Sequence, residues 1–195
     1  MGFLLDNCSV FPHTEEMSRN SRPFSCGDED LDDFFLHDAF KYERQLLSKS
    51  FCYRLDSDNS VIVCAFTLSN SSLDARNLPN NRKRKLAENI PHEKRISVYP
   101  ATLIGRLGVD SEFGGKGIGR ELMNFIKTWM LDPSNKTACR YLTVDAYNNK
   151  RTLDFYEKNG FKTVFSTDSQ EKDHIGLPQE KELKTRFMYF DLMWT

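Results

Sequence analysis

The chain of 195 residues lacks the features that mark membrane-bound or secreted proteins. It has no run of the roughly 18 apolar residues that a transmembrane helix needs. Residues 1–10 contain no basic segment, and Asp6 interrupts their short apolar stretch, so they do not resemble a signal peptide. Asp6 also stands where a myristoylation motif requires Ser or Thr. We therefore expect a cytoplasmic protein with no membrane partner.

Cysteines are few and widely spaced. There are five, at positions 8, 26, 52, 64 and 139. Their number is odd and no C-x-x-C pair occurs, so neither a disulfide framework nor a metal site is expected. Free thiols in a reducing compartment are the expected state.

The chain also lacks a strong net charge. Its formal charge is −1, whereas domains that act mainly on nucleic acid are usually more basic. The charge is unevenly distributed, because residues 28–33 are mostly acidic and the stretch Arg76–Arg95 is rich in Lys and Arg. The acidic residues suit the first turn of a helix. The basic stretch is interpreted either as a contact for RNA phosphates or as an ordinary solvated surface.

Hydrophobic periodicity predicts one α/β domain over residues 1–195. Strands are expected at 8–13, 50–55, 61–69, 99–109, 140–146, 161–165 and 185–193. Helices are expected at 28–47, 82–89, 117–131 and 149–159. An early hairpin followed by helical crossovers favours a mixed sheet with an antiparallel first half. Residues 166–184 are polar and are expected to form an excursion or a flexible loop.

A glycine-rich turn separates the strand that ends at Val109 from the next helix. Its residues are Gly114, Gly115, Lys116, Gly117, Ile118, Gly119 and Arg120. Glycines permit positive φ and a close approach of the backbone to a ligand. The amides at a helix N-terminus favour an anion, and the Lys and Arg add positive charge. A diphosphate is therefore the expected ligand.

The turn matches neither of the common nucleotide motifs. No G-K-[ST] follows at P-loop spacing, and a Rossmann turn would come early in a parallel unit instead of after an antiparallel half. A tight turn that needs glycine only for steric reasons is the alternative.

A second set of residues follows in the next strand and helix: Asn149, Thr152, Tyr156 and the pair Gly160-Phe161. With the glycine turn, their order and spacing resemble the GNAT superfamily of N-acetyltransferases over about Leu103–Phe165. The resemblance implies a mixed central sheet, with strands that splay after the Val109 region and helices on both faces. The chain departs from the family pattern at Gly114, where Gln or Arg is usual, and at Thr152, where Ala is usual.

A narrower resemblance covers more of the chain. The segments Phe24–Gly27, Leu31–Phe35, Leu78-Pro79 and Gly105–Asp110 are similar to a GNAT branch that includes toxins of toxin–antitoxin pairs. Those toxins acetylate the amino group of aminoacyl-tRNA. The resemblance implies tRNA bound through Arg76–Arg95 and an antitoxin protein as partners, and a homodimer is a further assembly to test.

The resemblance also implies a mechanism, the direct attack of a primary amine on the thioester of acetyl-CoA. The cofactor's pantetheine arm would lie along Leu107, Gly108 and Val109, and its pyrophosphate on the amides of 114–120. Tyr156 would protonate the departing thiolate, since the pKa values of a thiol and a phenol are close enough for proton transfer. Asn149 would hydrogen-bond the cofactor arm, cap the helix, or do both.

Alternatives remain at each of these points. Tyr156 could be an aromatic residue of the core. The candidate general bases are Asp110, Glu112, Asp145 and His92, and the sequence singles out none of them. An acetyltransferase of a small-molecule amine or of a protein amino group is the second hypothesis for function. A CoA-binding module without turnover is the third.

Overall fold

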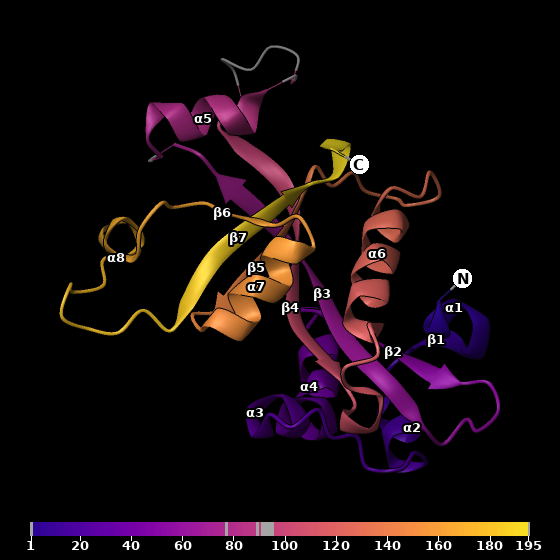
Figure 1. Ribbon diagram of the computed structural model, residues 1–195. Coiled ribbons are helices and arrows are strands. Elements are labelled where there is room, and N and C mark those ends of the chain that lie inside the picture. The colour runs from indigo at the N-terminus through magenta and orange to yellow at the C-terminus, as the bar shows by residue number, and fades with distance from the viewer. Residues whose placement is uncertain (1, 77, 89, 91–95, 195) are drawn as a thin grey trace. The chain divides into compact units, whose positions relative to one another are not determined.

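The computed structural model of the chain describes residues 2–76, 78–88, 90 and 96–194. They form two compact units, a first unit of residues 1–69 and 104–132 and a second unit of residues 70–103 and 133–195. Seven strands form a sheet in the order β1-β2-β3-β4-β5-β7-β6 (Figure 1). The prediction of a mixed α/β sheet is confirmed, and that of a single domain over 1–195 stays a prediction.

Most predicted elements begin and end close to their expected positions. The strands are β1 (Cys8–Pro12), β2 (Lys49–Leu55), β3 (Ile62–Asp74), β4 (Val98–Val109), β5 (Tyr141–Tyr147), β6 (Lys162–Thr163) and β7 (Thr185–Asp191). The helices of the first unit are α1 (Phe3–Asn7), α2 (Glu15–Arg19), α3 (Glu29–Asp33), the π-helix η1 (Phe34–Asp38), α4 (Ala39–Arg44), the 3₁₀-helix η3 (Ser111–Phe113) and α6 (Ile118–Met130). Those of the second unit are α5 (Asn80–Ala87), α7 (Lys150–Lys158), α8 (Asp168–Ile175) and the 3₁₀-helix η4 (Leu192–Trp194). The sequence did not predict α1, α2 or α8.

An antiparallel hairpin dominates the sheet of the first unit. β2 pairs with β1 on one side and with β3 on the other, and Phe51 lies opposite Phe66 while Cys52 lies opposite Ala65. Because successive side chains of a strand point to opposite faces, this register separates an aromatic face from a face of small residues.

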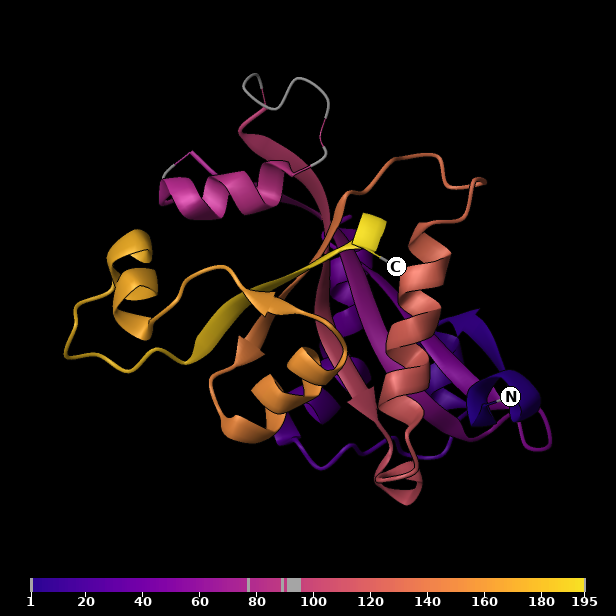
Figure 2. The same cartoon turned by 45° about the horizontal axis from the view of Figure 1, so that its top comes forward.

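Helices cover both of these faces. On the aromatic face lies α6 (Figures 1 and 2). Its Trp129 ring is centred 4.9 Å from the ring of Phe51. On the other face, Phe34, Phe35 and Phe40 form a core cluster with the small side chains of β2 and β3. This packing holds the strands that precede the glycine turn.

A π-helical turn interrupts the helix predicted for residues 28–47. The amide of Ala39 donates to the carbonyl of Phe34, five residues earlier, and this additional residue changes the register. Phe40 is buried in this segment, whereas Tyr42 and Leu46 are exposed. The prediction of one continuous helix over 28–47 is wrong, because a period of 3.6 contains no signal for a five-residue turn.

The second unit is built on β5 and β7, which pair antiparallel from Tyr141 opposite Asp191 to Tyr147 opposite Thr185. The ladder between β4 and β5 is parallel and joins residues 101–103 to residues 141–143. α7 and α5 cover opposite faces: Phe161, just after α7, packs on Phe190, while α5 packs on the neighbouring Tyr189 and on Tyr141.

Residues 166–184 contain the helix α8, so the prediction of a flexible loop is wrong over that part. Thr167 caps α8 by accepting a hydrogen bond from the amide of Gln170 at 3.3 Å, and the helix ends at Gly176 with φ of +70°. Its Glu171 is only 3% exposed. Such burial of a carboxylate requires a partner. Across the described ranges of the chain, no helix has the length and apolar character needed to cross a membrane.

Candidate functional site

The predicted diphosphate site joins β4 to α6 within the first unit, and Figures 1 and 2 both show the turn between them. Asp110 begins the turn. One of its carboxylate oxygens accepts the amide of Glu112 at 2.9 Å, and the other accepts the amide of Ser25 at 3.2 Å. Asp110, one of the candidate bases, therefore organises the loop with both oxygens.

Two of the glycines are required by the backbone. Gly115 and Gly117 have φ of +73° and +81°, in the left-handed region, and no atom lies within 4 Å of the position that a Cβ would take. Backbone conformation, and not crowding, selects glycine at these two positions. Gly114 differs, because its φ of −57° suits any residue and a Cβ there would lie 3.3 Å from the Ser111 carbonyl oxygen. The departure from the family pattern at Gly114 is thus compatible with the same turn.

The N-terminus of α6 presents backbone donors without a side-chain cap. Gly117 is the N-cap residue and forms no side-chain capping bond. The helix hydrogen bonds begin with the amide of Arg120, which donates to the Gly117 carbonyl at 3.0 Å. The amides of Ile118 and Gly119 precede this bond, so helix geometry leaves them without an intrahelical acceptor. A helix terminus of this kind is suited to binding a phosphate group.

Two basic side chains lie at the turn. Lys116 is exposed, its Nζ donates to the Glu112 carbonyl at 3.0 Å, and it lies 5.2 Å from the centre of the Phe113 ring. Arg120 is exposed on the first turn of α6. The acidic residue of that turn, Glu121, accepts the amide of Leu4 at 2.8 Å and is thereby engaged with α1.

The motif Phe24–Gly27 supports the strand predicted to bind pantetheine. A Cβ on Gly108 would lie 3.1 Å from the Phe24 ring and 3.2 Å from the Cys26 sulfur. Cys26 is itself held by its amide, which donates to Asp32 at 2.7 Å. Gly108 between Leu107 and Val109 is therefore explained by close packing on this segment, and the cofactor contacts of these three residues stay a prediction.

Asn149 caps α7 in the second unit. Its Oδ1 accepts a hydrogen bond from the amide of Thr152 at 2.9 Å, and its side chain is exposed. The capping role that the sequence suggested is present, and the Nδ2 group does not take part in it. A hydrogen bond from Asn149 to the cofactor stays a prediction.

Tyr156 lies on α7 and is 9% exposed. Its ring is centred 5.1 Å from that of Phe155 and 5.3 Å from that of Phe161. Burial raises the pKa of Tyr156 to about 12, so the phenol keeps its proton at neutral pH. A group in this state can donate a proton and cannot act as a base near pH 7. The aromatic packing and the protonated hydroxyl are compatible with both readings of this residue, core aromatic and proton donor.

Comparison with known proteins gives a family match for part of the chain. The family model described as an acetyltransferase (GNAT) domain matches residues 86–163, which include the glycine turn, Asn149 and Tyr156. Residues 86–163 thus match a GNAT acetyltransferase domain. The predicted activity, an N-acetyltransferase that uses acetyl-CoA, is confirmed with it.

Solved structures share the fold along nearly the whole chain. A Tyr-to-Phe mutant of KacT is 18% identical, with a TM-score of 0.72 and coverage of 96% of both chains. AtaT complexed with acetyl-methionyl-tRNAfMet is 21% identical, with a TM-score of 0.63 and coverage of 96% of this chain and 99% of AtaT. AtaTR bound with AcCoA is 19% identical, with a TM-score of 0.65 and coverage of 97% and 96%. At these identities the likeness establishes the fold of the chain and nothing further.

The remaining candidate bases lie in different surroundings. Glu112 is exposed on η3 beside the glycine turn. Asp145 is on β5 in the second unit, opposite Phe187 of β7, and it lines a cavity there. His92 lies outside the described residues.

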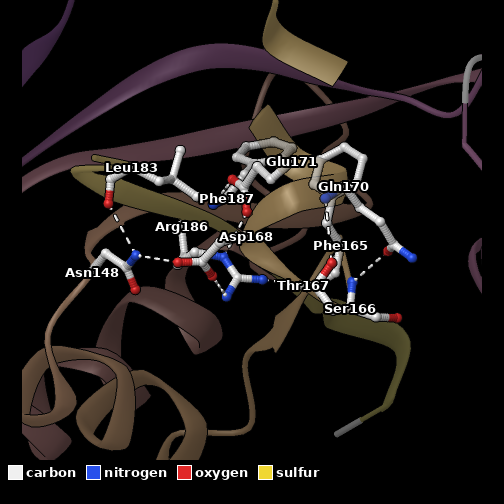
Figure 3. A network of polar contacts seen from close by, with 10 residues as sticks. All are labelled: Asn148, Phe165, Ser166, Thr167, Asp168, Gln170, Glu171, Leu183, Arg186 and Phe187. Atoms are coloured by element: carbon white, nitrogen blue, oxygen red, sulfur yellow. Dashed lines mark hydrogen bonds and ion pairs between the residues drawn. The ribbon is translucent and has the colours of Figure 1, made fainter. Parts of the chain in front are cut away.

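Sequence reasoning missed a polar network beneath α8 (Figure 3). The guanidinium of Arg186, on β7, donates to Glu171 at 2.7 Å, to Asp168 at 2.6 Å and to the Phe165 carbonyl at 2.9 Å. Glu171 also accepts the amide of Phe187 at 2.6 Å, and Asn148 donates to Asp168 at 2.9 Å. The sequence contains one signal for this network, because Arg186 is the one charged residue in the run Arg186–Phe190.

Two of the described basic side chains in the predicted tRNA-binding stretch Arg76–Arg95 already bind other groups of the protein. Arg76 pairs with Asp74 at 2.6 Å, and Arg82 donates to the Ser166 hydroxyl at 2.5 Å. Lys83, Arg84 and Lys85 follow on α5, which buries Leu86 and Ala87 at its C-terminal end. Asn89, Pro91, Lys94 and Arg95 lie outside the described residues.

Proposed function

We propose that this GNAT acetyltransferase acetylates the α-amino group of an aminoacyl-tRNA. The observation that carries the proposal is the likeness to AtaT in complex with acetyl-methionyl-tRNAfMet, which extends over 96% of this chain and 99% of AtaT. The amine of an aminoacyl ester suits the chemistry. An α-amino group has a pKa near 8, and an ester lowers it further, so part of it is neutral at pH 7 and can attack without a strong base.

The donor, acetyl-CoA, is assigned to the two sets of residues that the sequence singled out. Its pyrophosphate would bind the amides of the turn from Gly114 to Arg120, with Lys116 and Arg120 supplying positive charge. Its pantetheine arm would run along Leu107, Gly108 and Val109, and Asn149 would bond the arm with its Nδ2 group. The uncapped start of α6 and the left-handed φ of Gly115 and Gly117 support this assignment.

Tyr156 is proposed as the general acid. When the neutral amine attacks the thioester carbon, a C–N bond would form, the C–S bond would break, and the departing thiolate would take a proton from the phenol of Tyr156. The proton that the new amide nitrogen loses would restore the phenol. The pKa of the phenol is about 12. Burial that raises the pKa of the phenol also raises that of a thiol held beside it, so transfer from one to the other stays within reach.

The Tyr156→Phe variant tests this role. We expect kcat to fall by about 10²-fold or more while the Kd for acetyl-CoA, measured by calorimetry, changes by less than about twofold. Tyr189→Phe is the matched control, because Tyr189 is 8% exposed, also packs in the second unit and has no proposed contact with the cofactor. Full activity of the Tyr156→Phe protein would exclude the acid role.

The acceptor is tested by incubation with labelled acetyl-CoA and a full set of charged tRNAs. We expect label in acetyl-aminoacyl-tRNA and none on the uncharged tRNAs. Label on polyamines or peptides together with none on any charged tRNA would replace the proposal by the second hypothesis, a small-molecule or protein acceptor. Binding of CoA with no transfer to any amine would support the third, a module without turnover.

We assign the tRNA contact to Lys83, Arg84 and Lys85, because Arg76 and Arg82 already have partners in the structure. We also infer a cytoplasmic location, an antitoxin partner and a homodimer. One similar structure is the AtaT Y-to-F mutant toxin bound to the C-terminus of the antitoxin AtaR, 17% identical with a TM-score of 0.61. A small gene for a DNA-binding protein beside this one would identify the antitoxin, and sedimentation would measure the assembly.

A further inference from the structure

Helix α4 ends in a Schellman motif, a hydrogen-bonded turn that closes many α-helices. The amide of Leu47 donates to the carbonyl of Tyr42 at 3.0 Å, and the amide of Leu46 donates to the carbonyl of Glu43 at 2.9 Å. These bonds hold the backbone of Leu46 in the left-handed region, with φ of +57°. Among the described residues other than glycine, Leu46 alone has a positive φ. The motif therefore places a leucine where glycine is usual.

Leucine is unfavourable at this position. A left-handed backbone brings the Cβ of an L-residue too close to the following carbonyl oxygen, and glycine has no Cβ. Burial of the side chain in a core would offset this cost, but the Leu46 side chain is 92% exposed. The fold of a single chain therefore gives no reason for leucine here. Strained residues cluster at functional sites, which favours a contact with another molecule.

Two more apolar side chains are exposed next to Leu46. Tyr42 is 44% exposed and Leu47 is 58% exposed. The hydrogen bond between their backbones keeps these two residues side by side, and an apolar contact between these two positions often accompanies the motif. The Tyr42 ring is centred 5.3 Å from that of the buried Phe34, which helps to fix its position. Tyr42, Leu46 and Leu47 thus form one exposed apolar surface, which we call the α4 tip.

The charges around the α4 tip are balanced. Glu43 and the exposed Lys49 flank it with opposite signs. Arg44 forms an ion pair with Glu15. A membrane surface or a nucleic acid would select an excess of Lys and Arg around such residues, and the tip has no such excess. A second copy of the same surface, in contrast, offers a counter-charge to both Glu43 and Lys49.

We propose that the α4 tip is a contact between two copies of this chain that are related by a two-fold axis. In a two-fold contact both copies present the same surface, so the two tips would cover each other and Glu43 of one copy would face Lys49 of the other. Three side chains fall well short of the roughly 800 Å² that each partner buries in a stable interface, so the dimer is expected to dissociate on dilution. The proposal assigns a surface to the homodimer inferred with the proposed function, and it rests on that function in no other respect.

Sedimentation equilibrium of the full chain tests the contact, at concentrations from about 1 µM to about 1 mM. We expect reversible dimerisation with a Kd of about 10–100 µM. Leu46→Gly supplies the residue that the backbone prefers. The variant should therefore resist urea better than the wild type and still dimerise at least about tenfold more weakly. The matched control is Leu5→Ala, which removes a 76% exposed leucine from α1 and should dimerise like the wild type.

Three results would overturn the proposal. A wild-type chain that stays monomeric over the whole range would leave a different protein as the partner of the tip. An unchanged Kd of the Leu46→Gly dimer would place the contact elsewhere on the chain. A lower resistance of Leu46→Gly to urea would show that the single chain itself requires the leucine.

A charge exchange tests the two-fold geometry. Glu43→Lys and Lys49→Glu each bring like charges together across the axis, so each variant alone should dimerise about threefold more weakly at low salt. An equal mixture of the two variants restores opposite charges on both sides of the axis and should dimerise more tightly than either variant alone. A mixture that dimerises no better than its components would contradict the two-fold pairing.

Association and acetyl transfer are measured separately. A dimer that Leu46→Gly weakens, in a chain that transfers acetyl to no acceptor, would contradict the proposed function alone. Acetyl transfer to aminoacyl-tRNA by a chain that stays monomeric would contradict the α4 tip alone.

Discussion

The polar groups of the glycine turn and those of the Arg186 network differ in burial and in how many of their hydrogen bonds are made within the protein. At the turn, the amides of Ile118 and Gly119 precede the helix hydrogen bonds, and Lys116 and Arg120 remain exposed. Beneath α8, the guanidinium of Arg186 bonds two carboxylates and a carbonyl and is almost fully buried. The difference shows where the fold satisfies its polar groups internally and where helix geometry leaves amides without an intrahelical acceptor. Three changes test this contrast.

The largest effect is expected from Arg186→Met, which removes the cation of the network. Glu171 would then be a buried carboxylate without a counter-charge, and breaking a buried pair in this way costs about 3–5 kcal/mol. Urea unfolding measures the loss. The double variant Arg186→Met with Glu171→Leu should recover most of the stability, since it removes both charges. A loss below about 1 kcal/mol in the single variant would show that the network contributes little.

An intermediate effect on the free energy of unfolding is expected from the titration of His13, because this polar side chain is buried. It is 2% exposed, and its Nδ1 has no hydrogen-bond partner within the described residues. Burial lowers the pKa of His13 to about 4, from 6.5 for the free side chain. Below pH 6.5 the unfolded chain takes up a proton that the folded chain does not, so the stability from neutral His13 is present above pH 6.5 and is lost as pH falls towards 4.

Between pH 7.5 and pH 5 this difference lowers the free energy of unfolding by about 2 kcal/mol. Urea unfolding at both pH values measures it. His13→Gln does not titrate there, so its free energy of unfolding should vary less with pH over this window. Identical pH dependence in the two proteins would show that the histidine is accessible to protons in the folded state.

The smallest change in stability is expected at the turn itself. Gly117→Ala forces a Cβ into a left-handed backbone and should cost about 1 kcal/mol, with a weaker Kd for acetyl-CoA. Gly114→Gln is the matched control, because Gly114 has φ of −57° and its Cβ has to shift only slightly from the Ser111 carbonyl. Calorimetry with acetyl-CoA should show near-normal binding for Gly114→Gln. Equal losses in both variants would argue against the conformational role of Gly117.

Local signals were enough for the mixed sheet, the glycine turn and the cap at Asn149, because each is encoded within a few neighbouring residues. Glycine with positive φ, a helix that starts after Asn and alternating apolar residues are all short-range patterns. The network of Arg186 could not be predicted in the same way, since its partners lie 15 to 21 residues away. The register change at Phe34–Asp38 was missed because a π turn contains one residue more than the α-helical turn on which the prediction was based.

That register change makes the helical segment tolerant of the loss of one residue within the π turn. A π turn holds one residue more than an α turn, so deleting an exposed residue such as Leu36 would let Glu29–Arg44 become an uninterrupted α-helix. Because the π turn already absorbs one additional residue, the residues after the deletion would keep their orientation, and Phe40 would stay in the first unit's core. A substitution leaves the chain length unchanged and cannot remove the π turn in this way. In an alignment of relatives, gaps in this segment would therefore be more informative than amino-acid identity.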